Sequence, residues 1–139
     1  MRTRYFTPEE AALLLPRTEQ LLKDIQAFAA EMRSIHHALE EEAPPEPLSE
    51  EGRSAAFMRL ASLRRQFNAH RELLTQLGIE VKDIHKGLID FPALLDGREV
   101  CLCWKLGETG IAHWHTIEEG YSGRKPLTEV AAGAFCWFS

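Results

Sequence analysis

The most strand-like stretch of the 139-residue chain is Arg98-Glu99-Val100-Cys101-Leu102-Cys103-Trp104-Lys105-Leu106. Every second side chain from Val100 onward is apolar, the period of two that is typical of a strand with one buried face. Gly107-Glu108-Thr109-Gly110 then predicts a turn, and the chain returns through residues 111–117. These residues therefore predict an antiparallel hairpin.

A second hairpin precedes this strand. Asp96-Gly97 is a tight-turn dipeptide, and residues 87–95 lead into it. Residues 80–84 form a further short strand candidate. Two consecutive hairpins predict a mostly antiparallel meander. Pro92 indicates that its own strand lies at an edge of the sheet or breaks there, because proline has no N–H to donate.

The first half of the chain predicts two long helices. Thr7-Pro8-Glu9-Glu10 is a helix start, with a capping threonine and a proline in the first turn. We expect the first helix over residues 8–41 and the second over residues 49–78, between a Ser49 cap and Gly78. Both carry apolar seams at coiled-coil spacing: Leu14, Thr18, Leu21, Ile25, Phe28, Met32, Ile35 and Leu39, then Ala56, Leu60, Leu63, Phe67, His70, Leu74 and Leu77.

An acidic, proline-rich connection separates the two helices, EEEAPPEP at residues 40–47. A connection this short forces the helices to lie antiparallel, and seam positions pair when their numbers total roughly 91. This rule predicts Leu21 beside His70. The sequence thus predicts an α+β fold in one domain, residues 1–139, with a helical hairpin followed by a sheet portion over residues 80–139.

A two-helix hairpin leaves apolar flanks uncovered on both helices. The flanking side chains are Leu15, Leu22, Ala29, Phe57 and Leu73. Either the sheet or a second copy of the chain must cover them. We therefore expect a homodimer or a higher homo-oligomer.

Composition narrows the class of protein. The net charge is −5, from 16 Lys plus Arg against 21 Asp plus Glu, so nucleic acid is not an expected partner. No apolar stretch approaches the roughly 18 residues of a membrane span, and the start MRTRYFTPEE has no secretory apolar region. We expect a cytoplasmic protein without a disulfide framework, because there are three cysteines, Cys101, Cys103 and Cys136.

Several short motifs resemble the bacterial and archaeal domain-of-unknown-function family 2203. They are GLIDFP at residues 87–92, GREV at 97–100, LCWKLGE at 102–108, WH at 114–115, GYSGR at 120–124, and FTPEEA at 6–11 with LP at 15–16. The resemblance covers nearly the whole chain. It implies a bacterial, cytoplasmic protein, and it supplies no mechanism.

The register of the strands 98–106 and 111–117 decides which of the polar side chains share a face of the sheet. A two-residue loop at Glu108-Thr109 places His113 and His115 on the face of Leu102 and Trp104, whereas a loop of three or five residues shifts the register by one. We favour the shifted register because it keeps the apolar side chains together. The opposite face then gathers Asp90, Cys101, Cys103, Lys105, His113 and His115.

This face allows three interpretations. The two cysteines can be small buried hydrophobes beside two polar strand histidines. Cys101, Cys103, His113 and His115 are also ligand types for zinc or another divalent metal, although Cys-x-Cys with His-x-His is not a standard zinc spacing. The third interpretation is a catalytic thiol paired with His115.

A second set of candidate site residues is charged. It consists of Arg98, Glu99, Glu108 and Arg124. Arg124 follows the Gly120–Gly123 loop, whose amides can hold an anion. The alternative is a structural ion pair of Arg124 with Glu99 or Glu108. The candidate ligand-binding residues are therefore Asp90, Arg98, Glu99, Cys103, Glu108, His115 and Arg124.

No phosphate-binding glycine loop, GxSxG elbow or HExxH helix occurs in the chain, so no reaction is indicated. The sequence favours an interaction or scaffold domain that self-associates through its helical hairpin. The alternative is a small-ligand or metal-binding protein, with or without enzymatic activity, that uses the Cys/His/Asp face of the sheet.

Overall fold

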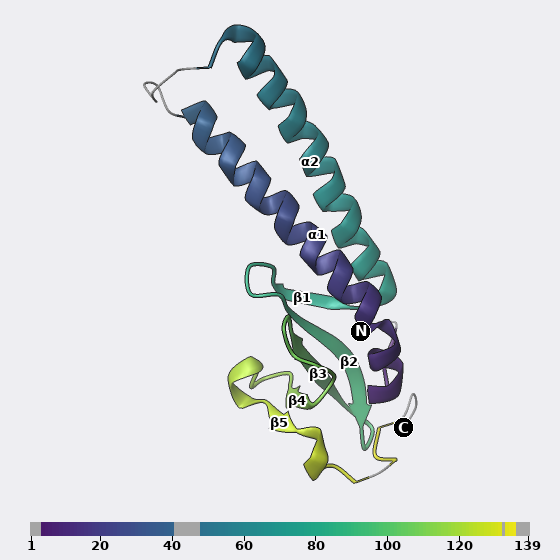
Figure 1. Cartoon of the computed structure of the whole chain (residues 1–139). Helices are drawn as coiled ribbons and strands as arrows, with labels where there is room; N and C mark the ends of the chain where they lie inside the picture. Colours follow the sequence, from purple (N-terminus) through teal and green to yellow (C-terminus); the bar gives the residue numbers. More distant parts are fainter. Residues whose placement is uncertain (1–3, 41–47, 132, 136–139) are drawn as a thin grey trace.

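The computed structural model describes residues 4–40, 48–131 and 133–135. It has the predicted α+β architecture, in which two long helices precede a five-stranded antiparallel sheet (Figure 1). The helices are α1 (Pro8–Glu40) and α2 (Glu50–Leu77). The strands follow in the order β1 (Glu80–Asp83), β2 (Leu88–Leu95), β3 (Arg98–Lys105), β4 (His113–Thr116) and β5 (Lys125–Pro126), which is also their order across the sheet. Two short 3-10 turns, Tyr121–Gly123 (η1) and Leu127–Glu129 (η2), flank β5.

The helix ends form as the sequence predicts. At the start of α1, the Thr7 amide donates to the Glu10 carboxylate and the Glu10 amide donates back to the Thr7 hydroxyl, a reciprocal capping box. The Ser49 hydroxyl accepts from the Gly52 amide at the start of α2. Gly78 ends α2 at φ 88°, a left-handed conformation in which a Cβ is disfavoured.

The two seams lie between the helices, and every seam position within them is buried or half-buried. Nearer the sheet, the polar and ring contacts of His70 involve residues farther along α1 than the pairing rule gives. His70 lies against Asp24 and Phe28, one to two turns from its predicted partner Leu21. Side chains on a helix lean toward its N-terminus, so His70 reaches toward the hairpin tip.

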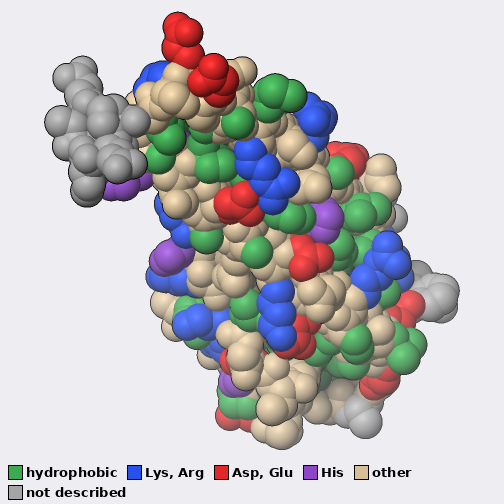
Figure 2. Space-filling view, turned by 45° about the horizontal axis from the view of Figure 1, so that its top comes forward, with side chains coloured by type: hydrophobic (Ala, Val, Ile, Leu, Met, Phe, Trp, Pro, Cys, Tyr) green, Lys and Arg blue, Asp and Glu red, His purple; other side chains and the backbone are tan. Residues whose placement is uncertain are grey.

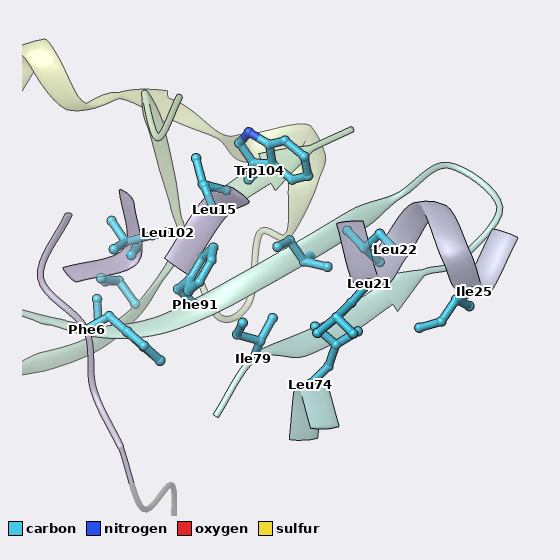
Figure 3. Close-up of a cluster of buried hydrophobic side chains, with 14 residues drawn as sticks. Phe6, Leu15, Leu21, Leu22, Ile25, Leu74, Ile79, Phe91, Leu102 and Trp104 are labelled. Carbon is cyan, nitrogen blue, oxygen red and sulfur yellow. The ribbon is translucent and has the colours of Figure 1, made fainter. Parts of the chain in front are cut away.

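One face of the sheet packs beneath the first half of α1 (Figure 3). The cluster contains α1 and α2 side chains together with Phe6, Ile79 and alternate residues of β2 and β3. Its largest fully buried members include Trp104, Phe91 and Leu22. The sheet therefore covers the predicted α1 flank at Leu15 and Leu22, while Phe57 on α2 remains 55% exposed.

Pro92 occupies an interior strand, because β2 pairs with β1 on one side and β3 on the other. The predicted edge position is wrong for β2 as a whole. β1 pairs only as far as Asp90, however, so Pro92 lies just past its end. Its carbonyl accepts from the Phe6 amide at 2.7 Å, and the missing N–H is not needed by a neighbouring strand.

The half of the hairpin nearer its tip extends beyond the sheet (Figure 1). In the space-filling view, acidic and basic side chains are interspersed over the visible face (Figure 2). Phe135 packs back on the core and bridges to Leu95, whereas residues 136–139, including Cys136, lie outside the described residues. Across the described residues, no helix combines the length and apolarity needed to cross a lipid bilayer.

We predict that Leu22→Ala lowers the free energy of unfolding by about 2–5 kcal/mol, because Leu22 is fully buried between α1 and the sheet and its truncation leaves a cavity. Urea denaturation followed by circular dichroism measures this change. Leu13→Ala is the matched control, since Leu13 is 82% exposed on the same helix and its truncation costs less than about 0.5 kcal/mol. Equal losses in the two variants would contradict the packing of α1 on the sheet.

Candidate functional site

The register of β3 and β4 is the shifted one that the sequence favoured. Cys101 lies opposite His115, and Cys103 lies opposite His113. On the other side of β3, Asp90 pairs with Cys103 and therefore lies on the same face, as predicted. The cysteine, histidine and aspartate side chains therefore share the sheet face that is turned away from the helices.

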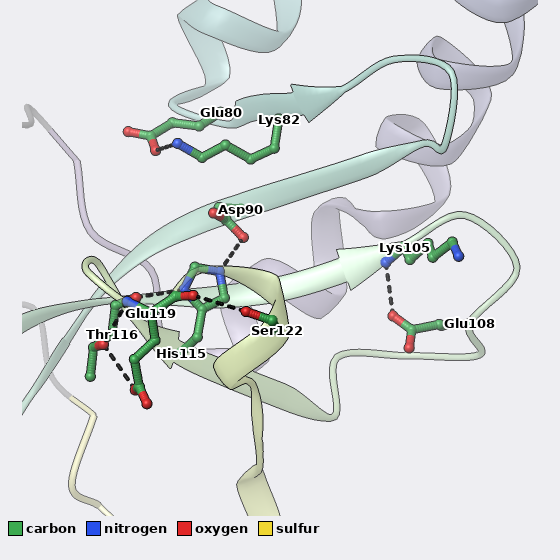
Figure 4. Close-up of polar contacts among 9 residues, drawn as sticks. All are labelled: Glu80, Lys82, Asp90, Lys105, Glu108, His115, Thr116, Glu119 and Ser122. Carbon is green, nitrogen blue, oxygen red and sulfur yellow. Dashed lines mark hydrogen bonds and ion pairs between the residues drawn. The ribbon is translucent and has the colours of Figure 1, made fainter.

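His115 and Asp90 form a buried ion pair on this face (Figure 4). The His115 Nε2 atom lies 2.9 Å from Asp90 Oδ1, and the two side chains are only 4% and 2% exposed. His115 is on β4 and Asp90 is on β2, so the imidazole spans the intervening strand β3. The pair thus ties together three neighbouring strands.

The second ring nitrogen of His115 has its own acceptor. Nδ1 lies 2.7 Å from the carbonyl oxygen of Thr116, which can only accept a hydrogen bond. Nδ1 therefore carries a hydrogen. This contact fixes the tautomer and the ring plane, and it aims Nε2 at Asp90.

The pKa of His115 is strongly perturbed. Burial is the largest single influence and lowers it, but hydrogen bonds to Asp90, Cys103 and the Thr116 carbonyl together outweigh burial. The result is a pKa raised from 6.5 to about 10. At neutral pH, His115 is therefore a buried cation paired with Asp90.

Cys103 completes a triad with these two residues. The donor atoms of Asp90, Cys103 and His115 all lie within 4.8 Å of one another, and all three residues are buried. A second group, within the same distance, joins Glu80, Asp90 and Cys101. Asp90 belongs to both groups and is the centre of the polar face.

A pocket of about 230 Å³ opens beside the triad. Asp90, His115 and Cys101 line it, together with Lys82 on β1 and Tyr121 in η1. Lys82 is itself paired with Glu80 at 3.2 Å. Leu88, Ile117 and Gly120 complete the wall. The pocket therefore combines a buried ion pair, a lysine and apolar side chains, and it can admit a small molecule.

Arg124 lies in an adjoining cluster at the His113 end of β4. Its Nη2 atom contacts the Glu108 carboxylate and His113 Nδ1, and its guanidinium lies 4.8 Å from the centre of the Tyr121 ring. The other carboxylate oxygen of Glu108 accepts from the Lys105 amide at 2.8 Å. Burial opposes the charge of Arg124, but the Glu108 contact outweighs it and raises the arginine pKa. Arg124 therefore locks the 107–112 turn onto the following loop.

The second predicted set of site residues, which is charged, does not form one site. Glu108 and Arg124 meet, whereas Arg98 and Glu99 lie at the opposite end of β3, where Glu99 accepts from the Tyr5 hydroxyl. Glu99 is four residues from Cys103, which is roughly 13 Å along a strand. Arg98 and Glu99 begin β3 and Glu108 follows its other end, so the length of this strand separates the two pairs.

The four predicted metal ligands do not converge on one point either. Cys103 joins His115 and Asp90, and Cys101 joins Glu80 and Asp90. His113 turns toward Arg124 and Glu108. Cys101 and Cys103 are both buried, and no disulfide joins them to each other.

Sequence reasoning missed Glu80 and Lys82. Glu80 lies opposite Asp90 across the β1 and β2 pair. Counting back from the Asp83 and Leu88 pair at the turn would instead place Glu80 opposite Phe91, on the other face of the sheet. An irregularity between Val81 and Asp83 shifts that register by one, which the sequence gives no means of placing. The hydrogen bond of His115 to Thr116 uses a backbone carbonyl, which every residue type has, so the sequence could not predict it.

We predict that the stability of the chelator-treated protein falls with rising pH. The folded pKa of His115 lies above its unfolded value of 6.5, so its contribution is complete below pH 6.5 and is lost as pH rises through about 10. The full contribution is on the order of a few kcal/mol. Urea denaturation at pH 6.5, 8 and 10 measures it as the difference between the native protein and His115→Gln. A difference that stays constant over this range would contradict the buried ion pair.

The comparisons with known proteins agree with the resemblance in the motifs. No curated protein and no solved structure matches the chain. One family model matches residues 4–127, and it is described as an uncharacterized conserved protein, DUF2203. The match includes both helices, the whole sheet and every residue of the triad. The chain therefore belongs to the DUF2203 family.

Proposed function

We propose that the protein binds a divalent transition metal ion, zinc foremost, through Asp90, Cys103 and His115. The observation that carries this proposal is the convergence of three different donor atoms, a carboxylate oxygen, a thiol sulfur and an imidazole nitrogen, within 4.8 Å at a buried point. Zinc accepts all three donor types, and borderline metals in general favour such a mixed set.

The distances support this proposal. Zinc binds nitrogen and oxygen at about 2.0–2.2 Å and sulfur at about 2.3 Å, so tetrahedral ligand atoms lie roughly 3.3–3.7 Å apart. His115 Nε2 and Asp90 Oδ1 are 2.9 Å apart. An ion that replaces the proton between them therefore needs to separate them by only about 0.4–0.7 Å.

The hydrogen bond of His115 supports it too. A histidine that binds a metal through one ring nitrogen usually donates the other N–H to a carbonyl or a carboxylate, which fixes the tautomer. The Thr116 carbonyl accepts from Nδ1 at 2.7 Å, so Nε2 is the nitrogen available to an ion.

The adjoining pocket supports a ligand-binding role for the bound ion. Three protein ligands leave one position of a tetrahedral ion for water or a small molecule. The pocket lined by Lys82 and Tyr121 reaches Asp90 and His115, so a small anion that binds the ion also meets the lysine. Activation of bound water is the chemistry that such an open zinc site supplies, and it makes an enzyme one outcome of this proposal.

The first experiment measures metal content by elemental mass spectrometry on protein purified without an affinity tag. We expect about one equivalent of zinc or a related metal, lost in Cys103→Ser and in His115→Ala. Substitution with Co²⁺ adds an independent readout, because a thiolate ligand gives a charge-transfer absorption band that Cys103→Ser removes.

His36→Ala is the matched control, since His36 is an exposed histidine on α1, remote from the triad, and its loss leaves the metal content unchanged. Circular dichroism confirms that each variant is folded. Folded wild-type protein that holds less than a tenth of an equivalent of metal, even after incubation with Zn²⁺, would sink the proposal.

The second candidate function is self-association through the helical hairpin, as an interaction or scaffold domain. A specific observation favours it: Phe57 and Met58 are 55% and 71% exposed on the part of α2 that extends beyond the sheet (Figure 1). Adjacent large apolar side chains on a projecting helix are typical of a protein contact. We expect a homodimer at micromolar concentration, measured by light scattering coupled to gel filtration, and a monomer at 100 μM would refute it.

Two further expectations concern the surroundings of the protein. Cys101 and Cys103 form no disulfide with each other, which is compatible with a reducing cytoplasm. The net charge of −5 disfavours a nucleic-acid partner.

A further inference from the structure

One face of α2 carries exposed side chains in a symmetrical order. Ser54 and Ala61 are small, and Phe57 and Met58 lie between them in sequence. At 3.6 residues per turn, all four point to the same side of the helix, away from the seam that contacts α1. All four are exposed.

The same face continues into charged residues at both ends. Glu50 and Glu51 lie one turn before Ser54, and Arg64 and Arg65 lie one turn after Ala61. These eight positions span roughly 140° of the helix circumference. The face is therefore acidic at its N-terminal end, apolar and small in the middle, and basic at its C-terminal end.

We propose that a second copy of the chain docks on this face, with the two α2 helices antiparallel and a two-fold axis between Phe57 and Met58. Residues of the two copies then face each other when their numbers total 115. Glu51 meets Arg64 of the other copy, Glu50 meets Arg65, and Ser54 meets Ala61. This proposal rests on self-association through the hairpin and specifies its geometry.

The symmetry of the face is the argument for a second copy over another partner. A two-fold contact uses the same surface on both molecules, so the surface must be complementary to itself after rotation. An acidic segment and a basic segment at equal distances from the centre meet this condition. The rotation brings opposite charges together, and every charge pair occurs twice.

The central side chains fit the same geometry. Ser54 and Ala61 are small enough to let two helix backbones approach closely, and Phe57 and Met58 then pack on either side of this contact. Burial of their exposed apolar surface drives the association. The sheet does not obstruct the approach, because these residues lie on the part of the hairpin that extends beyond it (Figure 1).

The paired residues Arg59 and Glu31, 2.6 Å apart, link α2 to α1 on a different side of α2. They leave the proposed face available.

The experiment uses two single charge reversals, Glu51→Arg and Arg64→Glu, in the full-length chain. Each variant by itself places like charges opposite each other twice in the dimer, and we expect its dimer dissociation constant to rise at least about tenfold. An equimolar mixture restores opposite charges at both contacts. We expect the mixture to form a heterodimer within about threefold of the wild-type affinity, measured by analytical ultracentrifugation or by fluorescence energy transfer between labelled copies.

Arg17→Glu is the matched control, because it makes the same charge change at an exposed position of α1 and leaves the dimer unchanged. Circular dichroism shows that each variant is folded, and recovery on mixing cannot come from a variant that has lost its fold. A wild-type dimer that neither reversal weakens refutes this geometry while self-association stands. A wild-type chain that is monomeric at 100 μM refutes both.

Discussion

The burial of one sheet face beneath α1 is the constraint on which the rest of the structure depends. Leu15 and Leu22 from the helix meet Phe91, Leu102 and Trp104 from the sheet in one cluster. Because side chains alternate along a strand, this choice of buried face assigns every residue of β2, β3 and β4 to one side or the other. A slip of one residue in the β3 and β4 register would place Trp114 on the polar face and His115 in the core.

The polar face follows from the same alternation. Asp90, Cys103 and His115 are buried although they point away from the helices, since neighbouring strands and the 117–123 segment surround them. Burying a charge without a partner costs several kcal/mol, so the close contact of His115 with Asp90 is what makes their burial tolerable. Three strands are tied by this contact, which couples the site to the integrity of the sheet.

The helical hairpin is supported differently near the sheet and near its tip. Near the sheet, α1 is part of the core, whereas nearer the tip both helices are supported chiefly by each other through their seams. The proposed metal site lies on the sheet face remote from α1, and the proposed dimer face lies on the outer side of α2. The two proposals are therefore physically independent, and a dimer would carry two separate pockets.

The sequence by itself determined the two helices, the first four strands and their order, but not β5 or the two 3-10 turns. The capping box at Thr7 and Glu10, the glycine at position 78 and the Asp96-Gly97 turn act through neighbours within four residues, so local sequence suffices to place them. The face shared by Asp90, Cys103 and His115 was also predictable, because a hydrophobic pattern fixes the strand register. Tertiary structure decided which of these side chains touch: His115 reaches Asp90 and His113 turns to Arg124, although the two histidines share one strand and one face. The tertiary structure likewise places Arg98 and Glu99 away from Arg124, and it places His70 beside Phe28. Such contacts depend on side-chain rotamers and on the relative position of distant segments, which residue types and spacings leave undetermined.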